Sequence, residues 1–64
     1  MKTKVYVSDD KKKLVGSIIG IKKIERQQGG FLLTFSNYDS AYRAAKVFMN
    51  SGFETVRIIG KETL

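Results

Sequence analysis

Alternation of apolar and polar residues predicts three β-strands in the first half of the chain. Valines alternate with polar residues across Thr3–Ser8, as in a strand with one buried face. The run Leu14–Arg26 is rich in isoleucine and valine and predicts one long strand, with a bulge or bend near Gly20, where its phase slips. Phe31–Phe35 alternates again and predicts the third strand.

Two polar segments separate these strands. Asp9–Lys13 contains only charged residues and predicts a turn at the tip of a first hairpin. Gln27–Gly30 ends in two glycines, which adopt the positive φ angles that tight hairpin loops need. The three strands are therefore expected to follow one another through two hairpins.

A single helix is predicted after the third strand. Ser36 and Asp39 have the spacing of a capping box at its start, and Gly52 suits a left-handed terminator at its end. Apolar residues recur between them at the spacing of one helical face, which we expect to pack on the sheet. These residues are Tyr38, Ala41, Tyr42, Ala45, Phe48 and Met49.

Together these elements predict an α+β fold of order β-β-β-α-β, a four-stranded sheet with one helix packed on one face. Thr55–Ile59 is the expected last strand and Gly60–Leu64 a short tail. A right-handed crossover through the helix makes the last strand parallel to the third. We expect the spatial order 3-2-1-4, with insertion of the last strand beside the third as the alternative. A chain of 64 residues has room for one domain, 1–64.

Positive charge is concentrated in the first 26 positions. They hold eight of the twelve lysines and arginines but three of the six acidic residues, in a chain of net charge +6. A local positive field attracts polyanions or acidic protein surfaces. Histidine and cysteine are absent, which removes the commonest acid–base, nucleophilic and metal-binding side chains. We therefore expect a binding module and not an enzyme, with no cofactor and no metal.

The length of the longest apolar run indicates whether the chain can span a membrane. The longest nearly apolar run, Leu14–Ile21, has eight residues, whereas a membrane-spanning helix needs about 20. No secretory signal is visible, so we expect a soluble, cytoplasmic protein with no membrane partner. With 42% hydrophobic residues, the chain is expected to fold.

The sheet face that the helix leaves uncovered is the candidate binding surface. Alternation places Lys4 and Tyr6 on it, and cations around an aromatic ring suit nucleic acid, because they neutralise phosphates while the ring stacks on a base. Lysines of the first turn and the second strand extend this charge as a stripe. The predicted binding residues are Lys4, Tyr6, Lys11, Lys12, Lys13, Lys22, Lys23, Arg26 and Arg57.

Three segments resemble known families. Val5–Val7 and Gly30–Phe35, followed by an alanine-rich helix, resemble parts of an RNA recognition motif without its first helix, with a glycine and a leucine where that family has base-stacking aromatic residues. Phe35–Phe53 resembles a half-repeat of the peptidoglycan-binding SPOR domains. Asp39–Ile59 resembles small phage-encoded inhibitors of bacterial RNA polymerase, which implies a one-domain, non-enzymatic protein with a helix on a sheet.

Three functional hypotheses follow. The first is a nucleic-acid-binding regulator, of DNA or RNA, that uses the lysine-rich N-terminal half. The second is a phage or mobile-element inhibitor or adaptor, which docks the same basic surface on an acidic site of a host enzyme such as RNA polymerase or a nuclease and is held there by an apolar anchor. The third is a homodimer joined through the uncharged run Leu14–Ile21.

Overall fold

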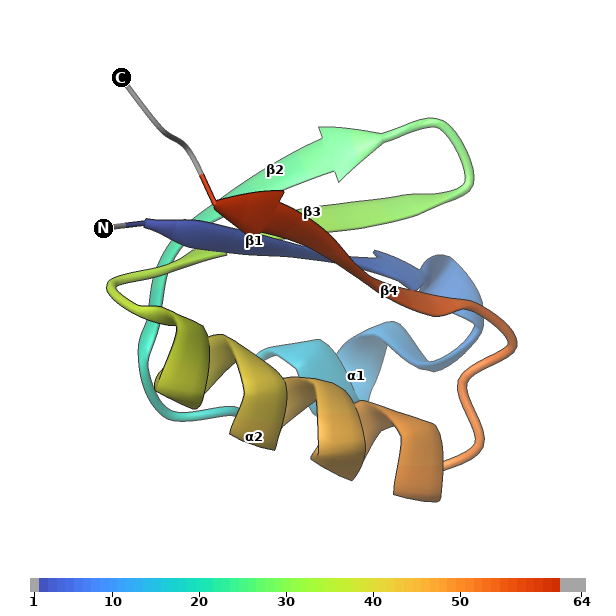
Figure 1. The fold of residues 1–64 in the computed structure, drawn as a ribbon. Coiled ribbons are helices and arrows are strands. Elements are labelled where there is room, and N and C mark those ends of the chain that lie inside the picture. Colours follow the sequence, from blue (N-terminus) through green and yellow to red (C-terminus); the bar gives the residue numbers. More distant parts are fainter. Residues whose placement is uncertain (1, 62–64) are drawn as a thin grey trace.

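The computed structural model describes residues 2–61, and of Lys12, Gly60 and Lys61 it describes the backbone alone. Four strands, one long helix and a short helical segment make up this part of the chain (Figure 1). The elements are β1 (Thr3–Ser8), η1 (Asp9–Lys11), α1 (Lys12–Val15), β2 (Ile21–Gln27), β3 (Gly30–Phe35), α2 (Tyr38–Asn50) and β4 (Val56–Lys61). The predicted tail Gly60–Leu64 lies mostly outside the described residues, and β4 continues to Lys61.

The four strands form one sheet of order β2-β3-β1-β4, in which all neighbours are antiparallel. The predicted α+β class, the β-β-β-α-β order of the main elements and the place of the last strand beside the first are confirmed. The predicted pairing of the first strand with the second is wrong. β1 pairs with β3, and β2 lies at the edge, because the connection from β1 to β2 contains η1 and α1 and is not a hairpin.

The segment predicted as one long strand divides into three parts. Lys12–Val15 forms α1, residues 16–20 turn, and β2 begins only at Ile21. Gly20 is one physical reason, since its φ of 101° lies in the region that favours glycine. A strand of thirteen residues would also exceed the usual length. The irregularity expected near Gly20 is present as a shift of the β2–β3 register between Ile21 and Lys23.

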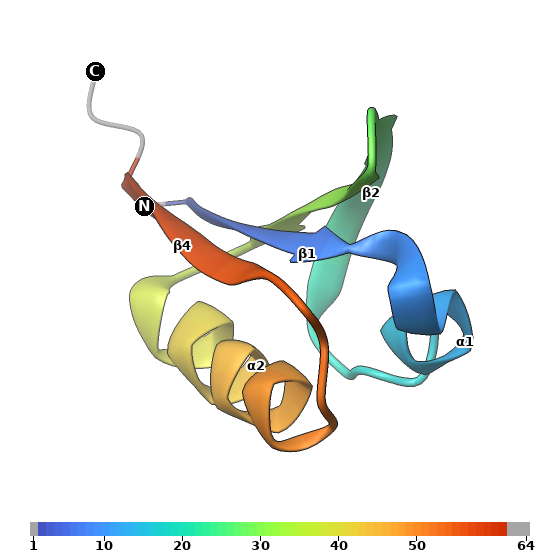
Figure 2. The ribbon, with the colours of Figure 1, turned by 90° about the vertical axis from the view of Figure 1, so that its right-hand side faces the viewer.

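The core lies between the sheet and the two helices, which are on the same side of the sheet (Figures 1 and 2). Side chains of β1, β3, α1 and α2 meet there, together with Phe53, whose ring contacts the Phe48 ring edge to face with centroids 5.1 Å apart. The opposite side of the sheet has no further layer within residues 2–61, and we call it the open face. The buried apolar residues are Val5, Val7, Val15, Leu33, Phe35, Ala41, Ala44, Ala45, Phe48 and Phe53.

The ends of α2 follow sequence signals, although one differs from the prediction. Asn37, and not Ser36, caps the N-terminus, because its side-chain oxygen accepts a hydrogen bond from the Ser40 N–H at 2.8 Å. At the C-terminus Gly52 has a φ of 88°, and the Phe53 N–H reaches the Phe48 carbonyl at 3.4 Å. This is the predicted left-handed termination.

The helix face that packs on the sheet is narrower than predicted. Three alanines and Phe48 form it, and small side chains allow the helix to approach the sheet closely. Tyr38 and Tyr42 are 46% and 45% exposed, and their rings stack on each other with centroids 6.0 Å apart. Met49 is exposed as well, so the prediction that these three residues face the sheet is wrong.

Candidate functional site

Strand register places cationic and aromatic residues together on the open face. Lys4 lies opposite Thr34 of β3, and Tyr6 lies between Leu32 of β3 and Arg57 of β4. Directly opposed residues of antiparallel strands point to the same face. The predicted grouping of Lys4, Tyr6 and Arg57 on one surface is therefore present.

A shallow hollow of about 350 Å³ lies on this face where β1 and β2 begin. Four lysines and one glutamate surround it, and Thr34, only 5% exposed, belongs to its lining. We call it the basic hollow, and its lining residues are Lys2, Lys4, Lys22, Lys23, Glu25 and Thr34. Such an arrangement concentrates ammonium groups that can bind a phosphate chain as point charges.

The lysines converge because β1 and β2 run in the same direction on either side of β3. The first residues of both strands consequently share one end of the sheet. The register shift after Ile21 adds an unpaired residue at Lys22, so that Lys22 joins Lys23 at the hollow. Glu25 forms an ion pair with Lys23 at 3.6 Å and is the one acidic group that lines the hollow among residues 2–61.

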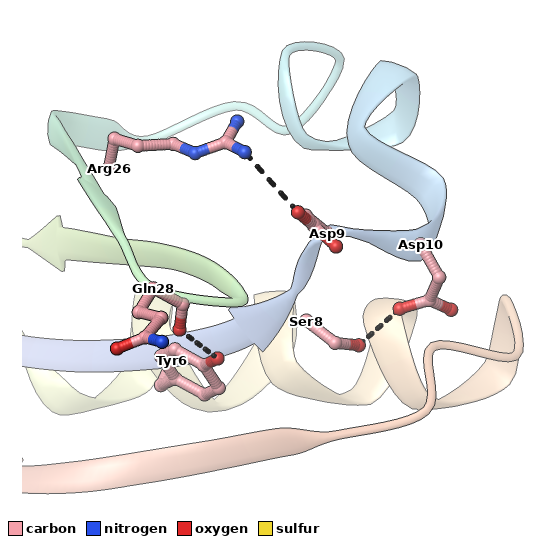
Figure 3. A network of polar contacts seen from close by, with 6 residues as sticks. All are labelled: Tyr6, Ser8, Asp9, Asp10, Arg26 and Gln28. Atoms are coloured by element: carbon pink, nitrogen blue, oxygen red, sulfur yellow. Dashed lines mark hydrogen bonds and ion pairs between the residues drawn. The ribbon is translucent and has the colours of Figure 1, made fainter.

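Tyr6 has a structural contact as well as a place on the open face. Its hydroxyl lies 3.4 Å from the Gln28 carbonyl oxygen, across the end of the β2–β3 hairpin (Figure 3). A Cβ atom at Gly30 would come within 2.7 Å of that hydroxyl oxygen and 2.1 Å of the Val7 carbonyl oxygen. The tyrosine ring therefore covers a strand position that only glycine can occupy, and it remains partly exposed.

The other predicted cations lie at the opposite end of β1. Here a second hollow of about 570 Å³ has two aspartates among its cations. We call this group the turn cluster, lined by Asp9, Asp10, Lys11, Lys13, Leu14 and Arg26. Its carboxylates offset most of its positive charge, so this larger hollow is the weaker candidate for a polyanion.

Arg26 is held by two neighbours in the turn cluster. Its guanidinium forms an ion pair with Asp9 at 3.3 Å and lies 5.0 Å from the centre of the Phe31 ring (Figure 3 shows the ion pair). Arg26 is opposed to Phe31, which itself is opposed to the buried Val7. Arg26 thus extends on the helix-covered side of the sheet and not on the open face.

Asp10 ties the turn after β1 to the segment before β4. Its carboxylate accepts hydrogen bonds from the Ser8 hydroxyl and from the Glu54 N–H at 3.2 Å, and the Ser8 oxygen accepts one from the Thr55 N–H at 3.0 Å. The bond from Ser8 has the largest effect on the carboxyl and lowers its pKa below the ordinary value, outweighing desolvation. The consecutive residues Asp9 and Asp10 therefore each have a partner in the fold, Asp9 in Arg26 and Asp10 in Ser8 and Glu54.

The nine predicted binding residues thus separate into two groups. Lys4, Lys22 and Lys23 meet at the basic hollow, with Tyr6 and Arg57 further along the open face. Lys11, Lys13 and Arg26 belong to the turn cluster, and the Lys12 side chain lies outside the described residues. Sequence reasoning missed Lys2, although its spacing of two from Lys4 is the signal that places both on one side of an extended chain.

Within residues 2–61, no three acidic side chains gather as a metal site would require. None of the helices in that range has the length and apolar character needed to cross a membrane. Comparison of the chain with family models, with curated proteins and with solved structures gave no match.

Proposed function

We propose that the protein binds nucleic acid on the open face of its sheet, as a non-catalytic regulator. The observation that supports this most directly is the convergence of four lysines on one hollow, with Glu25 as the single acidic residue among its described lining residues. Phosphates of a polynucleotide are the extended anions that such a row of ammonium groups neutralises, with release of counterions.

The rest of the open face suits the bases or sugars of the same ligand. Tyr6 and Arg57 are opposed to each other, next to the partly buried Leu32. An aromatic ring and a guanidinium plane both stack on bases without selecting a sequence. Lysine contacts to phosphate also carry no sequence information. We therefore expect binding with little sequence preference and a strong dependence on salt.

Fluorescence anisotropy with labelled random oligonucleotides, single-stranded and duplex, tests this proposal. If four phosphates are neutralised, log K should fall with log salt concentration with a slope of about −3 on single strands and about −3.6 on duplex. The variant Lys4→Gln/Lys22→Gln should lose about half of that slope and bind about tenfold more weakly near physiological salt.

The variant Lys11→Gln/Lys13→Gln is the matched control, because it removes the same charge from the turn cluster. It should keep the wild-type slope and an affinity within about twofold. Equal losses in both variants would show that net charge alone drives binding, and the basic hollow would then not be the site. No binding to any oligonucleotide at low salt would refute the function itself.

An inhibitor or adaptor that docks on an acidic protein remains the second candidate, because of one exposed side chain. Ile19 is 95% exposed at the turn before β2 and borders a groove of about 420 Å³. Val47 and Arg43 of α2 line the same groove. An isoleucine presented beside a cation is a suitable anchor for an apolar site with an acidic rim. In that case Ile19→Ser would abolish capture of the target and leave oligonucleotide binding unchanged.

A further inference from the structure

We infer that the protein forms a symmetric dimer by antiparallel pairing of β2 with β2 of a second copy. Within residues 2–61, β2 pairs only with β3, so its other edge offers backbone N–H and C=O groups to a further strand. An exposed edge of this kind is the surface on which β-strand addition occurs. The second strand is identified by the charge pattern of β2 itself.

The charges of β2 match those of a second β2 that runs antiparallel to it, when the pairing is centred on Ile24. If the two-fold axis passes between the two Ile24 residues, Lys23 of each copy lies opposite Glu25 of the other. Both residues point to the open face, since their partners on β3 are Thr34 and Leu32. In the monomer they pair with each other at 3.6 Å as exposed side chains, so the dimer replaces the two pairs within the separate copies by two pairs between the copies.

The same register brings apolar surface together on the other side of the sheet. Ile24 is 49% exposed, and beside it a groove of about 380 Å³ runs between β2 and the residues around α1. Val15, Ile18 and Ile21 line this groove together with two lysines, Lys22 and Lys23. The two Ile24 side chains would meet at the axis, each next to the groove of the partner, and would lose their exposure to water.

One contact in this register is unfavourable, and one difference between the two edge strands favours β2 over β4. The register also places Lys22 near Arg26 of the other copy, which opposes association, although Asp9 already holds Arg26 at 3.3 Å. The other edge strand, β4 (Val56–Lys61), contains no acidic residue, so a second copy of β4 could not place a carboxylate opposite its cations. Charged side chains on an edge strand discourage pairing with an arbitrary strand. A second strand with the order Lys-Ile-Glu places opposite charges next to each other and so favours pairing.

The dimer would extend the sheet to eight strands and place both open faces on the same side. Two basic hollows would then lie on one surface, on either side of the axis. The inference depends on the fold and on the β2 sequence, and it holds whether or not the ligand of the hollow is nucleic acid.

Sedimentation equilibrium of the purified protein without nucleic acid, from about 10 µM to about 1 mM, tests the dimer. Lys23→Glu and Glu25→Lys should each raise the dissociation constant at least about tenfold, because both opposed pairs become repulsive. The double variant Lys23→Glu/Glu25→Lys should associate within about threefold of wild type. A mixture of the two single variants should form heterodimers, since each then faces opposite charge.

The two single variants separate register from net charge. Lys23→Glu lowers the net charge of the protein and Glu25→Lys raises it, so a purely charge-controlled association would strengthen in the first and weaken in the second. Circular dichroism confirms that each variant is folded. A monomeric wild type at the highest concentration, opposite effects of the two single variants, or no recovery in the double variant would overturn the inference.

Discussion

The basic hollow and the turn cluster lie at opposite ends of β1. Both contain several cationic side chains, but they differ in the acidic residues beside them. At the basic hollow, Glu25 is the one acidic residue among the described lining residues, which include four lysines, and it forms an ion pair with Lys23. In the turn cluster, two aspartates lie among the cations, and both have fixed partners. The contrast shows that a count of lysines does not locate a binding surface. The acidic groups beside them decide whether charge is available to a ligand.

The two ends also differ in what they do for the fold. The turn cluster connects β1 to the segment before β4 through Asp10 and Ser8 and to β2 through Asp9. The lysines of the basic hollow stand around Thr34 on a face without a further layer. We therefore expect substitutions in the turn cluster to change stability and those at the basic hollow to change binding.

The largest effect is expected at Gly30, which lies opposite Ser8 at the turn-cluster end of β1. Gly30→Ala would bring a Cβ atom to 2.1 Å from the Val7 carbonyl oxygen and displace the Tyr6 hydroxyl, so it should lower the free energy of unfolding by about 3 kcal/mol. Gly16→Ala is the control, since no atom lies within 4 Å of its added Cβ and its φ is −70°. Urea unfolding should show a change below about 0.5 kcal/mol there. Equal tolerance at both glycines would contradict the close approach of β1 and β3.

Ser8→Ala tests the structural role of the turn cluster. The Thr55 N–H loses its acceptor, and for this reason the free energy of unfolding at pH 7 should fall by about 1–2 kcal/mol. Asp10 loses the hydroxyl donor of Ser8 and keeps the Glu54 N–H. Because the pKa of Asp10 is lowered in the folded protein, its stabilising effect is present above its ordinary pKa and is lost as the pH falls through the lower, folded value.

Unfolding measured between about pH 7 and pH 2 should therefore show a steeper loss of stability in wild type than in Ser8→Ala below about pH 4. Oligonucleotide affinity of Ser8→Ala should match that of wild type. Parallel pH profiles would mean that the hydrogen bond between Ser8 and Asp10 does not form in solution.

Thr3→Val separates stability from binding at the end of the sheet where the basic hollow lies. The Thr3 hydroxyl is fully buried and has no hydrogen-bond partner among the described residues. Its replacement by a methyl group of similar size should raise the free energy of unfolding by about 1 kcal/mol. Thermal unfolding should detect the increase, and oligonucleotide affinity should not change. A decrease in stability would show that the hydroxyl has a partner in solution.

The smallest effect is expected for the ion pair of Arg26 with Asp9. Both side chains are well exposed, so a double-mutant cycle with Arg26→Gln and Asp9→Asn should give a coupling free energy of about 0.5 kcal/mol. The salt dependence of oligonucleotide binding should stay unchanged in Arg26→Gln. A loss of slope in this variant would move Arg26 from the turn cluster into the binding surface.

The sequence predicted most of the elements but not their order in the sheet. The alternation of β1 and β3, the hairpin glycines and the end of α2 at Gly52 all follow from local rules. The prediction of a strand over Leu14–Gly20 is wrong because isoleucine and valine favour strands, whereas here Val15 is buried in the core from a short helix and Gly20 favours a turn. Because this helix lies in the connection between β1 and β2, the two strands do not form a hairpin, and β1 pairs with β3.

The candidate site was predictable only in part for the same reason. Lys4, Tyr6 and Arg57 follow from alternation along their own strands, so sequence placed them correctly on one face. Lys22 and Lys23 reach the hollow through the register shift, which the phase slip near Gly20 indicated, and through the direction of β2, which no local pattern indicates. The partners of Asp9 and Asp10 come from Arg26, Glu54 and Ser8, and tertiary contacts alone reveal that the turn cluster is largely neutralised.

The most direct test is a two-dimensional ¹H–¹⁵N NMR titration of the labelled protein with a short oligonucleotide at low salt. If the basic hollow is the site, the backbone amide signals of Lys4, Lys23 and Thr34 should move progressively with added ligand. Those of Lys11 and Lys13 should stay in place. Equal shifts in both regions, or shifts confined to the turn cluster, would contradict the account.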